Sequence, residues 1–333
     1  MDGGGGARHS ITNAHPITNP HRDAARGAGV TGDATAGATA SAGGETLRVV
    51  ANLGRSLLAR PVDGPARQVV PLRQLPLVVA GDLVRVATDA AGVERAVELL
   101  ARRSVLERPG EHGRAKALAA NLDALAVVSA APPGIDTLLI DQFCVGAHRA
   151  GLDAVVVLNK ADLLEAGRRA RAETMLEAYR AAGHVALACS VTGAPGLEAL
   201  EAALAGRAAA LVGASGAGKS SIVAALLPDL EVRVGEISAA TGLGAHTTSV
   251  TAWYARADGG AIVDSPGVRQ YAVETLDRAD VVAGYREIAR LGAACRFNDC
   301  GHAVEPGCAV REALAAGTLA RFRYANYRRL AGA

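Results

Sequence analysis

The sequence is poor in aromatic residues and has no apolar run long enough to cross a membrane. Aromatic residues are 3% of the 333 residues although 50% are hydrophobic, so Ala, Val and Leu supply most of the core. No apolar run approaches the ~18 residues of a membrane-spanning helix, and the N-terminus lacks the basic-then-apolar order of a secretory signal. We therefore expect a soluble, cytoplasmic protein with no membrane partner. We also expect it to be a monomer.

Net charge, lysine and cysteine are scarce as well. The 35 basic and 33 acidic residues leave a net charge of +2, which excludes a chain-wide affinity for polyanions. Only three basic residues are lysines: Lys116, Lys160 and Lys219. Because the chain uses arginine almost everywhere else, each lysine position is a candidate for a role that arginine cannot fill. Three of the five cysteines fall between 295 and 308, which favours a metal cluster over a disulfide framework.

The composition changes along the chain and predicts several domains. Residues 1–44 are rich in Gly, Ala and Thr and predict a disordered tail. Residues 45–110 predict a small β-barrel or β-sandwich, because short apolar runs alternate there with Gly, Pro and Asp; the runs are 47–50, 69–72, 77–79 and 83–86. Residues 111–275 have the pattern of an α/β domain, and residues 276–333 predict a helical, metal-binding domain.

The central region alternates apolar strands with helical stretches, which predicts a parallel sheet covered by helices on both faces. The expected strands are 124–130, 154–158, 185–188, 208–212 and 261–263. The expected helices include 165–182, 196–206 and 220–227.

A phosphate-binding loop follows the strand at 208–212. It matches G-x-x-x-x-G-K-[ST] and precedes a helix, the context that this motif requires. Its glycines allow backbone N–H groups to surround phosphates, its lysine supplies a positive charge to the β- and γ-phosphates, and its first serine binds Mg²⁺. The predicted nucleotide-binding residues are Gly213, Ala214, Ser215, Gly216, Ala217, Gly218, Lys219, Ser220 and Ser221. Lys219 is also a candidate catalytic residue.

The strand at 154–158 ends in an N-K-x-D motif that predicts guanine as the base. The carboxylate of Asp162 can accept hydrogen bonds from guanine N1–H and its N2 amine, whereas adenine would leave it unpaired. Lys160 can lie along the base, and Asn159 can tie this segment to the phosphate loop. Ser190 opens a segment, 190–193, whose backbone can meet guanine O6. The predicted ligand is GTP.

Two further segments, one that starts at Asp264 and one that contains Thr248, have the features of nucleotide-sensing switches. Asp264 follows a strand and can hold Mg²⁺ through water, while Gly267 meets the γ-phosphate. Thr248 is the candidate that completes, with Ser220, the Mg²⁺ ligands. Val268 stands where many related enzymes have a water-orienting Gln, so either His246 or a partner-ordered loop must orient the water.

The order of these motifs is unusual. Ordinary GTPases carry the phosphate loop before N-K-x-D, whereas here residues 159–162 and 190–193 precede the loop at 213. All the site-forming strands are expected, so the chain starts midway round the fold. The sequence thus predicts a P-loop GTPase domain in circularly permuted order, which surface-exposed termini tolerate.

A cluster near the C-terminus offers three thiolates and one imidazole. Cys295, Cys300, His302 and Cys308 can complete a tetrahedral structural Zn²⁺ site; unligated thiols are the alternative. Cys144 and Cys189 stand alone in apolar sequence and are expected in the core.

Residues 321–329 interleave four Arg with three aromatic residues. This pattern predicts one of two structures. Either the segment is a surface that binds RNA through phosphate contacts and base stacking, or it is a helix that packs its aromatic residues inward and leaves Arg in solvent.

The permuted order, together with G-A-S-G-A-G-K-S-S, H-T-T, D-S-P-G-V and C-R-F-N-D-C-G-H-A-V-E-P-G-C-A-V, resembles the bacterial GTPases that depend on the small ribosomal subunit. The resemblance is specific over 100–330. It implies an N-terminal OB-fold, a permuted GTPase domain and a C-terminal zinc domain.

That resemblance implies a factor of late 30S subunit maturation, with 16S rRNA as partner, whose GTP hydrolysis the subunit stimulates and couples to release. Residues 45–110 contain no aromatic residue, so any RNA contact there depends on Arg and backbone shape. One alternative is a non-catalytic RNA-binding scaffold that uses GTP as a conformational ligand. A P-loop kinase or ATPase is the other, and Asp162 disfavours it.

Overall fold

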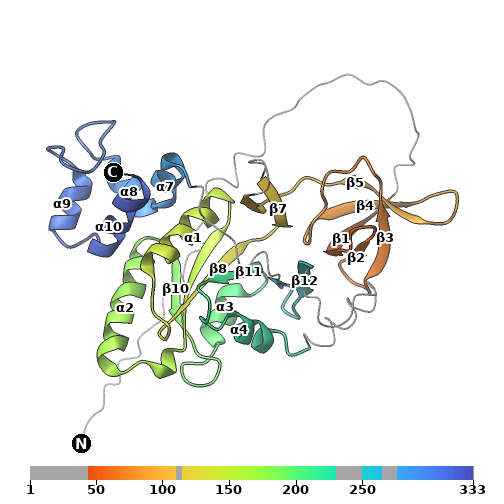
Figure 1. The fold of residues 1–333 in the computed structure, drawn as a ribbon, viewed down its shortest axis with the longest axis horizontal. Coiled ribbons are helices and arrows are strands. Elements are labelled where there is room, and N and C mark those ends of the chain that lie inside the picture. The colour runs from red at the N-terminus through yellow and green to blue at the C-terminus, as the bar shows by residue number, and fades with distance from the viewer. Residues whose placement is uncertain (1–43, 110–114, 230–249, 265–275, 333) are drawn as a thin grey trace, which may run out of the picture. The chain divides into compact units, whose positions relative to one another are not determined.

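A computed structural model describes residues 44–109, 115–229, 250–264 and 276–332 (Figure 1). The predicted tail, apart from Gly44, lies outside these ranges, as do three predicted site residues, His246, Thr248 and Gly267. No helix within the described ranges has the length and apolar character needed to span a membrane.

The first five strands close into a barrel. They are β1 (Glu45–Asn52), β2 (Leu57–Arg60), β3 (Arg67–Pro71), β4 (Leu83–Thr88) and β5 (Glu94–Leu99). Their order is β1-β2-β3-β5-β4, and β4 pairs back with β1, so the sheet closes on itself. Alternate aliphatic side chains fill the interior, among them Leu47, Val49, Leu57, Val69 and Val84. The barrel alternative of the sequence prediction is confirmed, and the sandwich is excluded.

One predicted strand in this region, at 77–79, is wrong. The backbone N–H of Val79 donates to the carboxylate of Asp82 at 2.8 Å instead of joining a strand ladder. Val78 still packs into the barrel core, while Leu77 stays half exposed. The apolar run therefore marked burial correctly, but a side chain rather than a neighbouring strand satisfies its backbone.

The central region is a doubly wound α/β sheet. After the two-stranded pair β6 (Val105–Pro109) and β7 (Ala115–Ala120), the chain alternates strands and helices. These are β8 (Ala124–Ala130), α1 (Thr137–Arg149), β9 (Asp153–Asn159), α2 (Ala166–Ala181), β10 (Val185–Ala188), α3 (Glu198–Leu204), β11 (Ala208–Gly213), α4 (Lys219–Leu226), β12 (Ala252–Ala255) and β13 (Ala261–Asp264). A short 3₁₀ turn, η4 (Ala161–Leu163), follows β9.

The order of these strands places the phosphate-loop strand in the middle of the sheet. The order is β10-β9-β8-β11-β13-β12, with β12 alone antiparallel to its neighbour in this part. Side chains from α1 and α2 pack on one face, as Phe143 and Leu176 do, and those of α3 and α4 pack on the other, as Leu200 and Ile222 do. Both faces are therefore covered, which explains why β8 is buried throughout.

The barrel and the central sheet are joined through β12. Ala51 of β1 pairs with Ala252 of β12, and the Arg48 guanidinium lies 4.5 Å from the centre of the Trp253 ring. Gly81 has φ = 91°, and a Cβ at this position would lie 2.1 Å from the carbonyl oxygen of Ala120. Glycine is therefore required where the barrel meets the segment that enters the central sheet.

Four helices form the C-terminal part. They are α7 (Arg278–Gly284), α8 (Arg286–Gly292), α9 (Ala309–Ala315) and α10 (Arg321–Leu330), drawn in blue in Figure 1. Helix α7 approaches α1 very closely, since a Cβ on Gly284 would lie 2.8 Å from the Cα of Val145. A helical C-terminal part is thus confirmed, and it packs on α1 of the central sheet.

A buried ion pair holds the start of β4 in the barrel. Asp82 is fully buried and accepts two hydrogen bonds from Arg102, at 2.7 and 2.8 Å. Replacing Asp82 by Ala leaves the Arg102 charge and the Val79 amide without this partner, so we expect a loss of about 3 kcal/mol in the free energy of unfolding, measured by urea denaturation.

The matched control is Glu98→Ala in the same barrel. Glu98 pairs with Arg85 at 2.8 Å, but both side chains are largely exposed, at 54% and 42%. Water and ions screen such a pair, so the expected loss is below about 1 kcal/mol. Equal losses for the two variants would contradict the role assigned to burial.

Candidate functional site

The phosphate loop, residues 213–220, connects the end of β11 to the start of α4. The ammonium group of Lys219 donates to the carbonyl oxygens of Gly213 at 2.9 Å and Ala214 at 2.7 Å, so the lysine side chain folds back over the loop. Gly218 has φ = 88° and caps α4. This geometry leaves a helix N-terminus and a lysine at one place, which is the arrangement that binds phosphates.

The base loop, residues 159–162, is bonded directly to the phosphate loop. The Asn159 side-chain amide donates to the carbonyl oxygen of Ala217 at 2.9 Å, and the Lys160 ammonium donates to that of Gly216 at 2.7 Å. A Cβ on Gly218 would lie 2.3 Å from the Asn159 amide nitrogen, so only glycine fits there. The two predicted loops therefore lie side by side although 58 residues separate the Asn159 and Ala217 partners.

Asp162 is oriented by the segment that follows β10. The Ser190 hydroxyl donates to the Asp162 carboxylate at 2.5 Å and accepts from the backbone N–H of Gly193 at 3.0 Å. A Cβ on Gly193 would lie 2.9 Å from the Asp162 Cβ, so the two segments are in contact. The carboxylate that is expected to read the base is thus fixed by a second loop rather than left on a free turn.

All the described site residues lie at one edge of the sheet. Because β8, β9, β10, β11 and β13 are parallel, their carboxyl ends meet at the same edge, which we call the nucleotide edge. Asp264 ends β13, the neighbour of β11, and so belongs to this edge as well. Ligands of open α/β sheets bind outside the carboxyl ends of the strands.

Sequence reasoning missed one contributor to this edge, the loop 131–136 after β8, which we call the proline loop. Its Pro132 carbonyl accepts from the Lys160 ammonium at 3.4 Å, and its Pro133 ring lies 3.8 Å from the position of a Cβ on Gly216. The available signal was positional: this loop follows a buried strand that neighbours the phosphate-loop strand, so it must end at the nucleotide edge.

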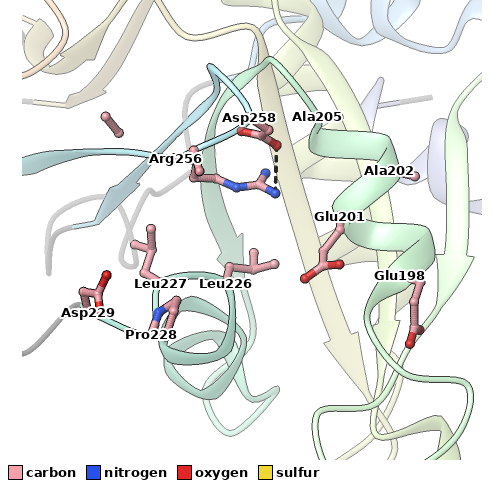
Figure 2. A pocket seen from close by; sticks show the side chains of 12 residues that line it. Glu198, Glu201, Ala202, Ala205, Leu226, Leu227, Pro228, Asp229, Arg256 and Asp258 are labelled. Carbon is pink, nitrogen blue, oxygen red and sulfur yellow. Dashed lines mark ion pairs between the residues drawn. The ribbon is translucent and has the colours of Figure 1, made fainter. Parts of the chain in front are cut away.

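An open pocket of about 580 Å³ lies at the other edge of the sheet (Figure 2). Its lining comes from α3 along its length, from the end of α4 with the residues that follow it, and from the turn between β12 and β13, where Arg256 pairs with Asp258 at 3.0 Å. Because this turn precedes β13, the pocket adjoins the amino ends of the parallel strands. It is therefore separate from the nucleotide edge.

The cysteine–histidine cluster has the dimensions of a tetrahedral zinc site. Its four ligand atoms all lie within 4.8 Å of one another; they belong to Cys295, Cys300, His302 and Cys308. The Sγ atoms of Cys295 and Cys308 are 3.9 Å apart, and His302 Nδ1 lies 3.6 and 3.5 Å from them. Tetrahedral zinc at its usual bond lengths requires about 3.8 Å between sulfurs and about 3.5 Å from sulfur to nitrogen. The donor set and its spacing therefore fit zinc.

The surrounding residues hold the cluster in place. Burial acts to raise the pKa of the Cys295 thiol, but hydrogen bonds from the amides of Val310 and Ala309, at the start of α9, leave that pKa below its ordinary value. Burial lowers the pKa of His302, which favours the neutral, metal-binding imidazole. The Tyr324 hydroxyl of α10 donates to the His302 carbonyl oxygen at 2.6 Å. Helix α10 thus supports the cluster.

The two isolated cysteines are core residues, as the sequence predicted. Cys144 and Cys189 are buried, and burial raises their pKa to about 12 and about 11. Thiols with such values stay protonated near neutral pH and are poor nucleophiles or ligands.

Helix α10 uses its aromatic residues for packing, so the inward-packing alternative for 321–329 is correct. Tyr327 is buried, and Phe322 packs against the core cluster of α1 and α2. One part of that alternative is wrong: Arg323 is not in solvent but only 2% exposed, because two carboxylates neutralise it in the interior.

A phosphate loop bonded to an N-K-x-D loop at one sheet edge, with the phosphate-loop strand late in the chain, defines a circularly permuted P-loop GTPase. The RsgA GTPase family model matches residues 99–274. The chain belongs to the RsgA GTPase family, and it is a GTP hydrolase, which confirms the resemblance stated from its motifs.

Relatives match over most of the chain. A protein of Pseudomonas aeruginosa (strain LESB58), named small ribosomal subunit biogenesis GTPase RsgA, is 37% identical over 86% of this chain and 84% of its own length. A protein of the same name from Chromohalobacter salexigens is 41% identical over 85% and 84%.

Solved structures share the fold. YjeQ from Thermotoga maritima superposes with a TM-score of 0.68 at 26% identity, covering 86% of this chain and 96% of that chain. YloQ, described as a circularly permuted GTPase, gives a TM-score of 0.69 at 20% identity, over 89% and 97%. The circularly permuted order of the strands is therefore shared with a solved structure.

The cluster geometry predicts one zinc ion per chain, measured by elemental analysis of purified protein. Cys308→Ser should lose most of the zinc and lower the melting temperature by about 5 °C or more, because metal binding contributes directly to folding. Cys144→Ala is the control: it removes a buried thiol outside the cluster and should retain the zinc. Equal zinc contents in the two variants would refute the site.

Proposed function

We propose that the protein is a late-stage assembly factor of the 30S ribosomal subunit, with 16S rRNA as a binding partner. In this proposal the subunit stimulates GTP hydrolysis, and hydrolysis triggers release of the factor. The name shared by relatives that are 37% and 41% identical supports this assignment. We further propose that the protein acts as a monomer in the cytoplasm.

The base loop is proposed to select guanine. The Asp162 carboxylate would accept two hydrogen bonds from the base, Lys160 would cover one face of it, and the segment that opens at Ser190 would meet its O6. The hydrogen bond from Ser190 to Asp162 supports this role, since it restricts the carboxylate to one orientation. Adenine offers no donor at the corresponding positions and would leave a desolvated carboxylate unpaired.

The phosphate loop is proposed to bind the triphosphate. Its backbone N–H groups would surround the phosphates, and Lys219 would exchange the carbonyl oxygens of Gly213 and Ala214 for the β- and γ-phosphates. Mg²⁺, when bound, neutralises the charge that develops on the phosphates. Ser220 and Thr248 would ligate it directly, and Asp264 would hold it through water.

Two further residues complete the proposed catalytic machinery, and both lie outside the described residues. Gly267 would meet the γ-phosphate, and His246 would orient the attacking water. These roles stay predictions from the motif positions, as does a partner-ordered loop in place of His246.

The domain boundaries are proposed as residues 1–44, 45–110, 111–275 and 276–333. The last of these would carry a structural zinc ion on Cys295, Cys300, His302 and Cys308, whose spacing supports a tetrahedral site. Zinc would fix the loop between α8 and α9 without taking part in hydrolysis.

Replacing Asp162 by Ala should weaken GTP binding by on the order of 100-fold and remove the preference for guanine, because two buried hydrogen bonds are lost. Competition of ATP against labelled GTP measures this preference. Asp258→Ala, at the opposite edge of the sheet, is the control and should leave it unchanged. A variant at Asp162 that still discriminates against ATP would refute the assigned role.

Purified 30S subunits should raise the rate of phosphate release from GTP by on the order of tenfold or more, and purified 50S subunits should not. Equal effects of the two subunits would refute the proposed partner. Turnover that stays negligible with 30S would instead favour the GTP-switched scaffold. Equal affinity for 30S with GDP and with a non-hydrolysable GTP analogue would contradict coupling to release.

A further inference from the structure

A fully buried carboxylate lies on the face of α1 that meets the C-terminal helices. Asp141 is 0% exposed and accepts hydrogen bonds from the hydroxyls of Tyr179 at 2.7 Å and Tyr285 at 2.9 Å, and from the amide of Asn326 at 2.8 Å. Arg323 of α10 forms an ion pair with the same carboxylate. The Asp141 carboxylate therefore accepts hydrogen bonds from α2, from the junction of α7 and α8, and from α10.

Arg323, the arginine in this cluster, also has several partners besides Asp141. Its guanidinium also pairs with Glu287 of α8 at 2.7 Å and lies 5.0 and 4.4 Å from the ring centres of Tyr179 and Tyr285. Burial and the nearby Asp141 raise the pKa of both tyrosines, so their hydroxyls remain protonated donors. A shift of α10 along α1 would leave buried charges unpaired, so the cluster fixes a single docking position.

The same cluster reaches the first turn of α1. The Tyr179 hydroxyl also donates to the Thr137 carbonyl oxygen at 3.3 Å, and the Asn326 amide donates to the Thr137 hydroxyl at 3.2 Å. Asp136 caps this turn by accepting from the backbone N–H of Leu139 at 3.1 Å. The start of α1 is therefore tied to α10 by side-chain hydrogen bonds.

The proline loop connects this turn to the nucleotide edge. At its far end the Pro132 carbonyl oxygen accepts from Lys160, and Pro133 lies against Gly216 of the phosphate loop. One short segment is thus held on one side by the residues that bind nucleotide and on the other by the Asp141 cluster. Every residue in this chain of contacts lies within the described part of the protein.

We propose that the Asp141–Arg323 pair positions the nucleotide site: by fixing the first turn of α1, it holds the proline loop against Lys160 and Gly216. Asp141 and Arg323 are positioning residues, since neither is placed at the nucleotide. Docking of the C-terminal helices and binding of a guanine nucleotide then stabilise each other by the same factor, as linkage requires. The inference rests on the proposed nucleotide site.

GDP affinity tests this proposal, with fluorescently labelled GDP as the probe. Asp141→Asn keeps the size of the side chain but removes its charge, and it should raise the dissociation constant about 5- to 20-fold. Glu287→Gln is the matched control: it removes a charge from the same guanidinium, but Glu287 lies on α8 and no described hydrogen bond joins it to α1. It should lower the melting temperature and leave GDP affinity within about twofold of wild type.

A purely structural cluster would give a different result. Unchanged GDP affinity in folded, zinc-loaded Asp141→Asn would overturn the proposal, as would equal losses of affinity in the two variants. If Asp141→Asn does not fold, Arg323→Lys replaces it, because a lysine keeps the charge but cannot bridge both carboxylates. It should weaken GDP binding at least threefold, and unchanged affinity would again overturn the proposal.

Hydrogen exchange supplies a second readout that stability alone does not move. GDP should slow exchange of the α10 amides in the wild-type protein and have a smaller effect in Asp141→Asn. An equal effect of GDP in both proteins would contradict the coupling. Failure of wild-type protein to bind GDP would reject the nucleotide site itself, an outcome distinct from wild-type binding that the variants leave unchanged.

Discussion

The hydrogen bonds from Asn159 and Lys160 to the carbonyl oxygens of the phosphate loop are the interactions on which the proposed nucleotide site depends. They join two loops that leave different strands, at 2.9 and 2.7 Å. A Cβ on Gly218 would prevent the first of them. Because the lysine and the asparagine each bind backbone oxygens, the base loop and the phosphate loop keep a fixed separation, which is what a nucleotide of fixed length needs.

Circular permutation does not change this contact between the two loops. The carboxyl ends of parallel strands lie at the same edge of a sheet, whatever the order of the strands in the chain. The permutation does change which parts of the chain flank the site. The chain runs from β13 to helices that pack on α1, and it enters the central sheet from a barrel whose β1 pairs with β12. Both additional parts therefore contact elements of the GTPase fold.

Much of the fold could be predicted from residues that are neighbours in sequence. The strands β8 and β10 have the predicted bounds, because buried parallel strands are short apolar runs; β8 is buried throughout, and β10 at its two central residues. The strand prediction at 77–79 is wrong because apolar character reports burial and not the hydrogen-bond partner of the backbone. The strand β12 was not predicted, since its four residues are too few to show the apolar pattern of a strand.

The sequence by itself determined which residues are the candidates for binding phosphate, for reading guanine and for ligating a metal, since that choice depends on side-chain type and local spacing. Only the tertiary structure decided that Arg323 is buried against Asp141, 182 residues away in the chain, and that the proline loop lies between them and the phosphate loop. The reason is physical. A charged side chain enters the interior only where folding brings an opposite charge to meet it, and no local pattern encodes that meeting.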